Sequence, residues 1–191
     1  MDIHPTTSLL EPFGVQFDLL HGTMRDPHEH IVRRAAEMRG YYADEEALER
    51  LIAQHDNPLH YETFESPVPE ESGQVKFCIS KLYPGLVGEE CFMTKGHYHA
   101  TLQTGEAYLC LAGEGLMLMK TADGACRWEE FAVGRLVYVP PCWAHRSINT
   151  GDVPLISLCF YPGDAGHNYG DIRTEGFPRR VLRRKGELII A

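Results

Sequence analysis

The sequence predicts an all-β fold with a short helical segment near its N-terminus. From about residue 74 onward, short runs rich in Val, Ile, Leu, Tyr and Phe follow one another at regular intervals. Turn signals such as Pro84-Gly85 and Asp123-Gly124 separate these runs. Helix-starting signals stand out only in the first sixty residues. The regular spacing of short strands favours an antiparallel sandwich or barrel over a parallel α/β fold.

Two helices are expected before the strands begin. The dipeptide Asp26-Pro27 is typical of an N-cap and first helical residue, and predicts a helix that ends near Arg39. Asp44 predicts the cap of a second helix that extends to about Gln54. Two short helices cannot bury their apolar stripes alone. We therefore expect residues 1–60 to be an extension packed on a barrel formed by residues 61–191, the two parts making one structural unit.

The strand pattern fills the rest of the chain. Each predicted strand combines β-favouring residues with flanking Gly, Pro, Asn or Asp. In chain order the predicted strands are Gln74–Tyr83, Glu90–Lys95, Glu106–Leu111, Gly115–Thr121, Cys126–Phe131, Leu136–Val139, His145–Asn149 and Pro154–Tyr161.

The composition excludes several classes of function. The formal net charge of −9, with 27 acidic and 18 basic residues, argues against general nucleic-acid binding. No apolar stretch is long enough to cross a bilayer, so no membrane partner is expected. Six cysteines occur without a Cys-x-x-Cys pair, and Met1–Pro5 lacks the basic start and apolar core of a secretory leader. These features predict reduced thiols and a cytoplasmic protein.

Three histidines and one glutamate have a spacing that suits a metal site. Residues two apart in a strand point to the same face, so His97 and His99 would aim at one point. Glu106 follows after room for a turn, and His145 follows a Pro-Pro step. A single histidine is more often a surface or core residue, but the joint pattern is specific. Three imidazoles and one carboxylate suit a divalent transition ion, and leave coordination positions open for substrate or water.

Two stretches of the chain resemble the two motifs of the cupin superfamily. The first stretch runs from Gly96 through Glu106 to Gly115, and the second runs from Gly134 through Pro140 and His145 to Asn149. Within that superfamily, the chain resembles the cupin-type glucose-6-phosphate isomerases from about residue 11 to about residue 190. The matching stretches are Glu11–Val15, Gly40–Tyr42, Leu82–Gly85, Thr94–His97, Val139–Pro141, Trp143–His145 and Tyr161–Gly170.

The resemblance implies a jelly-roll barrel that interconverts glucose 6-phosphate and fructose 6-phosphate as a homodimer. It implies one divalent metal ion per subunit, with Fe²⁺ favoured over Mn²⁺, Ni²⁺, Co²⁺ or Zn²⁺. The implied metal ligands are His97, His99, Glu106 and His145, and the implied catalytic residues are Glu106 and His167. The implied substrate-binding residues are Ser80, Thr94, Gly96, Tyr108, Tyr161 and Tyr169.

The chemistry of each side chain indicates which role the predicted site residue would have. Ser80 and Thr94 offer hydroxyl groups to a phosphate, and Gly96 allows its backbone N–H to approach closely. Strand alternation would point Lys95 away from Thr94, so Lys95 is not assigned. Glu106 is the natural base for a cis-enediol route, and a direct hydride shift between C1 and C2 is the alternative. Cys142 stands where the family has Tyr, and a thiol cannot replace the reach of a phenol or its strong hydroxyl donor.

Other functions remain open at this level. A cupin dioxygenase would share the three histidines and the glutamate, but would be expected to lack the phosphate hydroxyls near Thr94. Another cupin-type sugar-phosphate isomerase or epimerase is also possible, although the stretch from Tyr161 to Gly170 argues against it. A non-catalytic sugar-binding cupin is the alternative from a different class. Such proteins often have broken ligand sets, whereas all four ligands are intact here.

Overall fold

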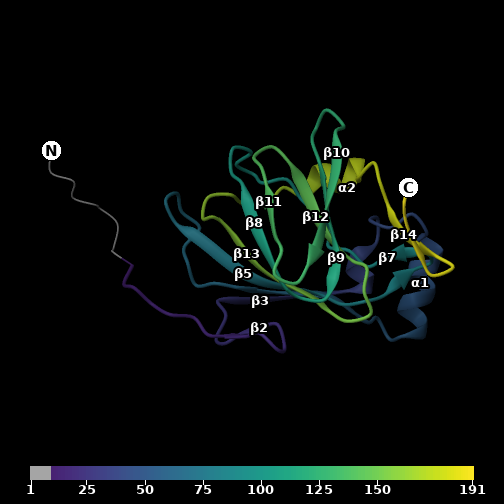
Figure 1. Ribbon diagram of the computed structural model, residues 1–191, viewed down its shortest axis with the longest axis horizontal. Helices are drawn as coiled ribbons and strands as arrows, with labels where there is room; N and C mark the ends of the chain where they lie inside the picture. The colour runs from purple at the N-terminus through teal and green to yellow at the C-terminus, as the bar shows by residue number, and fades with distance from the viewer. Residues whose placement is uncertain (1–9) are drawn as a thin grey trace.

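Antiparallel strands make up most of the regular secondary structure in the computed structural model, which describes residues 10–191 (Figure 1). The largest sheet has the strand order β11-β8-β13-β5-β4-β3, and a second sheet has the order β10-β9-β12. Side chains from both sheets meet in one apolar core, which includes Met117, Cys78 and Phe131. The strands of these sheets are β3 (Glu29–Arg34), β4 (Leu59–Glu65), β5 (Val75–Leu82), β8 (Glu106–Ala112), β9 (Glu114–Lys120), β10 (Cys126–Ala132), β11 (Leu136–Val139), β12 (Ala144–Asn149) and β13 (Leu155–Pro162).

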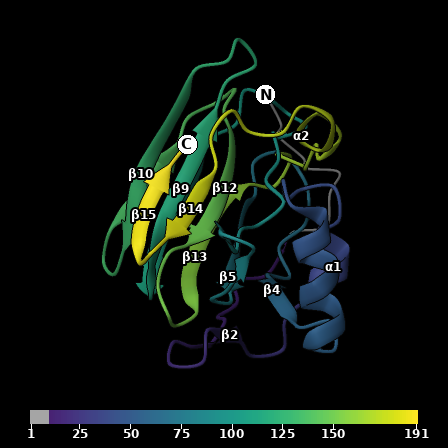
Figure 2. The ribbon, with the colours of Figure 1, turned by 90° about the vertical axis from the view of Figure 1, so that its right-hand side faces the viewer.

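Smaller elements complete the fold. A third sheet has the order β15-β14-β7-β6, and β1 pairs with β2. The helix α1 lies at the edge of the molecule (Figure 2), where it contacts η1 and β6. Its buried residues Ala47 and Leu48 join the main core. The bounds are β1 (Phe17–Asp18), β2 (Thr23–Met24), the 3-10 helix η1 (Ala35–Met38), α1 (Glu45–Gln54), β6 (Leu86–Val87), β7 (Glu90–Cys91), α2 (Gly170–Glu175), β14 (Val181–Arg184) and β15 (Glu187–Ile190).

The prediction of an all-β fold of the cupin, jelly-roll kind is confirmed. Most predicted strands agree with β5 and with β8 to β13 to within one or two residues. The exception is Glu90–Lys95, where regular pairing covers only Glu90–Cys91, with one further bridge between Met93 and Ile148. The chain leaves the sheet there and reaches Gly96, whose φ is +75°.

The predicted helix from Asp26 to Arg39 is wrong. This segment forms β3 and then η1. β3 pairs with β4 at the edge of the largest sheet, with Ile31 opposite Thr63. Ile31 and Val32 are β-branched and suit a pleated surface, and tertiary pairing outweighs the helix-start signal. Asp26 has a φ of +50°, which is not the conformation of an N-cap.

The second predicted helix is confirmed as α1. Its N-cap residue Asp44 accepts a hydrogen bond from the backbone N–H of Ala47 at 2.8 Å. Glu45 and Glu46 lie in the first turn, where acidic side chains interact favourably with the helix dipole. The division at residue 60 stays a prediction. β3, from the first part, lies in the same sheet as β5, β8 and β13.

Three expectations concern the chain's surroundings. Met1–Pro5 lies outside the described residues. Within residues 10–191, no helix combines the length and apolarity needed to cross a bilayer. All six cysteines are free thiols, and Cys78, Cys91, Cys110 and Cys159 are buried.

Candidate active site

One face of the largest sheet lines a cavity of about 460 Å³. Alternate residues on each strand face this cavity, as the period of two in a β-strand requires. On β4 these are Tyr61, Thr63 and Glu65, and on β8 they are Glu106 and Tyr108. The remaining walls include Lys76, Cys78 and Ser80 from β5, Cys159 and Tyr161 from β13, His145 and Ser147 from β12, and the segment 94–97.

Backbone hydrogen bonds join the two motif segments. The N–H of His97 donates to the carbonyl of His145 at 3.2 Å, and the N–H of His145 donates to the carbonyl of His97 at 3.1 Å. The N–H of Thr94 donates to the carbonyl of Ser147 at 2.9 Å, and the N–H of Ser147 donates to the Thr94 hydroxyl at 3.1 Å. The guanidinium of Arg146 donates to the carbonyl of Lys95 at 2.7 Å. These contacts hold segment 94–97 against β12.

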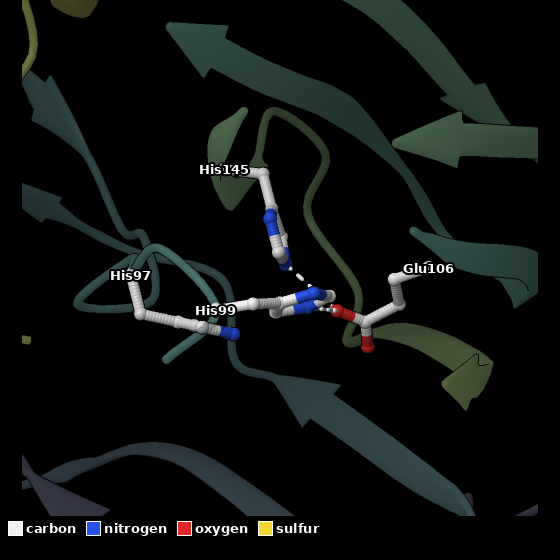
Figure 3. A group of neighbouring side chains, drawn as sticks. All are labelled: His97, His99, Glu106 and His145. Atoms are coloured by element: carbon white, nitrogen blue, oxygen red, sulfur yellow. Dashed lines mark hydrogen bonds and ion pairs between the residues drawn. The ribbon is translucent and has the colours of Figure 1, made fainter. Parts of the chain in front are cut away.

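The four predicted ligands converge on one point (Figure 3). One potential ligand atom from each of His97, His99, Glu106 and His145 lies within 4.8 Å of the others. The Oε2 atom of Glu106 is 3.1 Å from Nε2 of His99 and 2.9 Å from Nε2 of His145. Opposed ligands of one ion stand about 4.2 Å apart when each bond is about 2.1 Å. Small side-chain rotations would therefore close this group around an ion.

The donor atoms of this group fit a cation. Nε2 of His97 is buried and has no hydrogen-bond partner among the described residues. Burial, followed by the nearby His145, lowers the pKa of His97 well below its usual range, so its imidazole is neutral. Nδ1 of His99 lies 3.0 Å from the carbonyl of Thr104, which can only accept. That contact places the proton of His99 on Nδ1 and leaves the Nε2 lone pair free.

Glu106 is the charged member of the group. Burial by itself raises the pKa of its carboxyl group, but the adjacent imidazoles of His145 and His99 outweigh burial and lower that pKa. The carboxylate is therefore ionised inside the cavity wall. An ionised carboxylate together with three imidazoles is a suitable ligand set for Fe²⁺, Mn²⁺, Ni²⁺, Co²⁺ or Zn²⁺.

The structure brings the other predicted site residues to the same cavity. Ser80, Thr94, Gly96, Tyr108 and Tyr161 line it. The Tyr108 hydroxyl lies 2.9 Å from Nε2 of His145. His167 and Tyr169 also line the cavity, with parallel rings 5.7 Å apart, and the His167 ring lies 4.5 Å from that of His97. Among the predicted site residues, His99 does not line the cavity wall. Its Nε2 atom contacts the carboxylate of Glu106, which does line the wall.

Gly96 has a packing reason for its identity. Its φ of +75° is strained for other residues, and a Cβ atom there would lie 2.9 Å from the Phe177 ring and 3.0 Å from the His145 carbonyl. Because the backbone turns at Gly96, strand alternation does not apply to its neighbour. Lys95 lines the cavity together with Thr94 and Gly96, although alternation predicted that it would point away.

Sequence reasoning missed several polar residues of the cavity. Thr63 and Ser147 add hydroxyl groups near Ser80 and Thr94, respectively: Thr63 is paired with Ser80, and Ser147 is bonded to Thr94. Glu65 and Lys76 add charges. The alternation of strand β5 places Lys76 on the same face as Ser80. Strand β4 was not among the predicted strands, so no comparable signal was read for Thr63 and Glu65.

The unusual Cys142 lies apart from the cavity. Its side chain is exposed and does not line the cavity wall. Its thiol accepts from the side-chain amide of Gln103 at 3.7 Å. Trp143 is partly buried against the main core, as a packing residue would be.

Several known proteins are similar to this chain. A solved oxalate decarboxylase from Lactobacillus farciminis is similar over 56% of this chain and 30% of that chain, at 18% identity and a TM-score of 0.45. The glucose-6-phosphate isomerase of Thermococcus litoralis is 45% identical over 180 residues, covering 94% of both chains. That of Pyrococcus furiosus is 44% identical over 178 residues, covering 93% of both chains.

A sequence model of one family spans most of the chain. The family is described as "Glucose-6-phosphate isomerase (GPI)", and its model matches residues 32–190. That range includes the four converging ligands and most of the residues that line the cavity around them. The chain belongs to the glucose-6-phosphate isomerase family of aldose–ketose isomerases.

Proposed function

We propose that this protein is a metal-dependent isomerase that interconverts glucose 6-phosphate and fructose 6-phosphate. One observation carries the proposal: three histidines and an ionised glutamate converge at a cavity that also presents Ser80, Thr94 and Lys95. A sugar phosphate has its reacting carbons at one end and its phosphate at the other. It therefore needs metal ligands at one end of the site and phosphate-binding groups at the opposite end. A dioxygenase or a plain sugar-binding protein has no need for the phosphate-binding groups.

The phosphate end is built from hydroxyl groups, a backbone N–H and positive charge. Ser80, Thr94 and Gly96 supply the uncharged donors. Lys95 lines both this cavity and an adjoining hollow, which Arg33 and Arg173 also line. Among the described residues, Lys95 and Arg173 have no ion-pair partner, and the nearest partner of Arg33 is Glu37 at 3.5 Å. The positive charges of Lys95 and Arg173 therefore attract a phosphate dianion.

The reacting end is built around Glu106. His97, His99, Glu106 and His145 would hold the metal ion, which supplies a Lewis acid that stabilises negative charge as it develops on the substrate. Glu106 would take the proton from C2 of the open-chain sugar and return it to C1 through a cis-enediol. Tyr108 and His145 keep the carboxylate and its neighbours in place. His167 lines the cavity and is exposed, so it can bind a sugar hydroxyl or assist ring opening.

The first experiment is a coupled assay for conversion of fructose 6-phosphate. The protein is stripped with EDTA and then reconstituted separately with Fe²⁺, Mn²⁺, Ni²⁺, Co²⁺ and Zn²⁺. We expect activity to disappear with EDTA and to return with a divalent ion, most strongly with Fe²⁺. A folded protein that binds an ion and yet turns over no substrate would contradict the proposal, and would favour the dioxygenase or sugar-binding alternatives.

Isotope exchange distinguishes the two routes. A proton returned by Glu106 exchanges partly with solvent, so the product formed in D₂O should carry deuterium at the transferred position. A direct hydride shift carries no solvent hydrogen. If the proton returns to the sugar faster than it exchanges with solvent, a proton transfer also leaves no deuterium in the product. Single-turnover measurements that vary the rate of proton return separate this case from a true hydride shift. Absence of deuterium under all these conditions would overturn the enediol route.

We also propose a homodimer that works in the cytoplasm, in glycolysis or gluconeogenesis. The free thiols of the chain suit a reducing compartment. Light scattering coupled to size exclusion should give about twice the 21.6 kDa of one chain. A mass of one chain across micromolar concentrations would contradict the dimer.

A further inference from the structure

A buried network of charged groups lies along the cavity wall, beside the metal-binding group. The Tyr161 hydroxyl donates to Oε2 of Glu65 at 2.5 Å. Nζ of Lys76 lies 4.0 Å from the same Glu65 oxygen and 2.7 Å from Oε1 of Glu70. Glu65 is 8% exposed and Lys76 is 4% exposed. All four of these side chains line the cavity.

Stability alone does not account for this network. Burying a carboxylate and an ammonium group costs several kcal/mol per ion, and apolar residues of similar volume often stabilise a fold as well or better. Glu65 and Lys76 enter the cavity wall from the neighbouring strands β4 and β5. Their charges therefore act at the place where a substrate would lie.

The chemical consequence falls on Tyr161. A phenol has one hydrogen to donate, and here Glu65 accepts that hydrogen. The Tyr161 oxygen can then only accept a hydrogen bond from a group inside the cavity. The negative charge of Glu65 makes that oxygen a stronger acceptor, because hydrogen bonds in a chain polarise one another. Sugar hydroxyl groups are suitable donors.

The position of Tyr161 indicates which part of the substrate this acceptor would bind. Its ring lies 6.1 Å from the His167 ring, which in turn lies 4.5 Å from the His97 ring. An acceptor at this position faces the sugar near the metal-binding group. Lys95, with Thr94 and Gly96, belongs to a different wall of the cavity.

We propose that Glu65 is a positioning residue for the isomerisation, because it orients the Tyr161 hydroxyl as an acceptor for a sugar hydroxyl while the nearby Lys76 favours the carboxylate form of Glu65. The inference rests on the proposed function and extends it to residues that do not touch the metal-binding group. Glu65 acts only through Tyr161. Loss of either side chain should therefore have one and the same consequence for turnover.

A double-mutant cycle tests this dependence in the metal-loaded enzyme. We expect Glu65→Ala and Tyr161→Phe each to lower kcat/KM roughly tenfold, the order of one hydrogen bond to a charged group. The double variant should be no worse than Tyr161→Phe by more than about twofold, since Glu65 has nothing left to orient. Losses that multiply, or a Glu65→Ala variant with unchanged kcat/KM, would overturn the proposal.

Two further measurements separate positioning from general damage. Inorganic phosphate, used as a competitive inhibitor, should keep its inhibition constant within about twofold in all three variants. Among the described residues, none of its proposed binding groups (Ser80, Thr94, Lys95 and Gly96) is hydrogen-bonded to the side chain of Glu65 or Tyr161. A parallel loss of phosphate binding would mean a distorted cavity and would overturn the proposal. The matched control is the bond from the Tyr83 hydroxyl to Oε2 of Glu62 at 2.6 Å, which also involves a β4 glutamate but lies outside the cavity. Glu62→Ala and Tyr83→Phe should leave kcat/KM unchanged.

Folding does not limit the test. Where Glu65→Ala leaves the charge of Lys76 poorly paired and the chain fails to fold, Glu65→Met/Lys76→Met removes both charges together. The cycle is then run with Tyr161→Phe on that background, with the same two readings. Lack of activity in the unmodified enzyme with every metal would refute the proposed function. An active enzyme in which Glu65 and Tyr161 act independently would refute this inference alone.

Discussion

At the scale of single residues, His97 has a buried side-chain atom that a bound ligand would pair. Its Nε2 atom is buried without a partner in residues 10–191, and a buried polar atom left unpaired costs about 1–3 kcal/mol. A metal ion would satisfy that atom. Backbone hydrogen bonds in both directions hold His97 against His145, which fixes the position from which the His97 ring extends.

Replacing His97 should abolish tight metal binding. We expect His97→Ala to weaken binding by at least roughly 100-fold, since loss of even an outer partner of a ligand costs 10–100-fold. The metal content after dialysis, measured by mass spectrometry, reports the change. His30→Ala is the control, because His30 is exposed and pairs with Glu62 at 2.9 Å. Equal metal content in both variants would contradict the ligand role of His97.

Lys95 should act on binding more than on turnover. A phosphate group remote from the reacting carbons is bound equally in the ground state and the transition state. We expect Lys95→Met to raise KM for fructose 6-phosphate about tenfold, with kcat changed less than about twofold. Lys81→Met, outside the cavity, should leave both constants unchanged. A fall in kcat with constant KM would argue against a phosphate contact.

At the scale of elements, α1 and β3 show two different sources of secondary structure. α1 follows from local signals: a side-chain cap at Asp44 and acidic residues in its first turn. β3 depends on a partner that is distant in the sequence, since its register with β4 joins residues about thirty positions apart. The local signal at Asp26-Pro27 therefore did not decide the outcome.

The cap of α1 can be tested by unfolding in urea. Asp44→Ala removes the acceptor for the Ala47 N–H and should lower the free energy of unfolding by about 1 kcal/mol. Asp44→Asn keeps a capping oxygen and should lower the free energy of unfolding by only a few tenths of that amount. The ion pair from Asp44 to Arg50, at 3.8 Å and exposed, adds little. Equal losses in both variants would assign the effect to charge instead of capping.

At the scale of the whole molecule, His60 joins distant segments around a neutral imidazole. Its Nε2 atom lies 2.8 Å from the Tyr42 hydroxyl and 3.1 Å from the carbonyl of Met93, and its ring packs on that of Phe92. Burial lowers the pKa of His60 from 6.5 to about 3. Below pH 6.5 the unfolded chain therefore binds a proton that the folded chain does not.

The sign of the resulting pH effect is definite. The contribution of His60 to stability is complete above pH 6.5 and is lost as the pH falls toward 3. Within that window it should add a slope of about 1.4 kcal/mol per pH unit to the free energy of unfolding. Denaturant unfolding of EDTA-treated protein between pH 4 and 6 should show a shallower slope for His60→Asn. His55→Asn, at the exposed end of α1, is the control, and an unchanged slope in His60→Asn would refute the assignment.

The sequence by itself determined the features that rest on local chemistry and short spacing. Strands β8 to β13, the cap of α1 and the four candidate metal ligands were readable because turn residues, strand alternation and His-x-His spacing are local signals. The resemblance to a known family extended this to Ser80, Thr94, Tyr161 and His167, which all line the cavity.

Only the tertiary structure decided features that depend on distant partners. The turn at Gly96 brought Lys95 into the cavity, because the chain there leaves the regular pleat. The pairing of β4 with β5 placed Glu65 beside Lys76, and the pairing of β5 with β13 brought Tyr161 to Glu65, 96 residues away in the sequence. Because these charged groups are buried, they interact more strongly than they would in water. Neither strand pairing nor burial is written in the local order of the residues, since both arise from the packing of the whole chain.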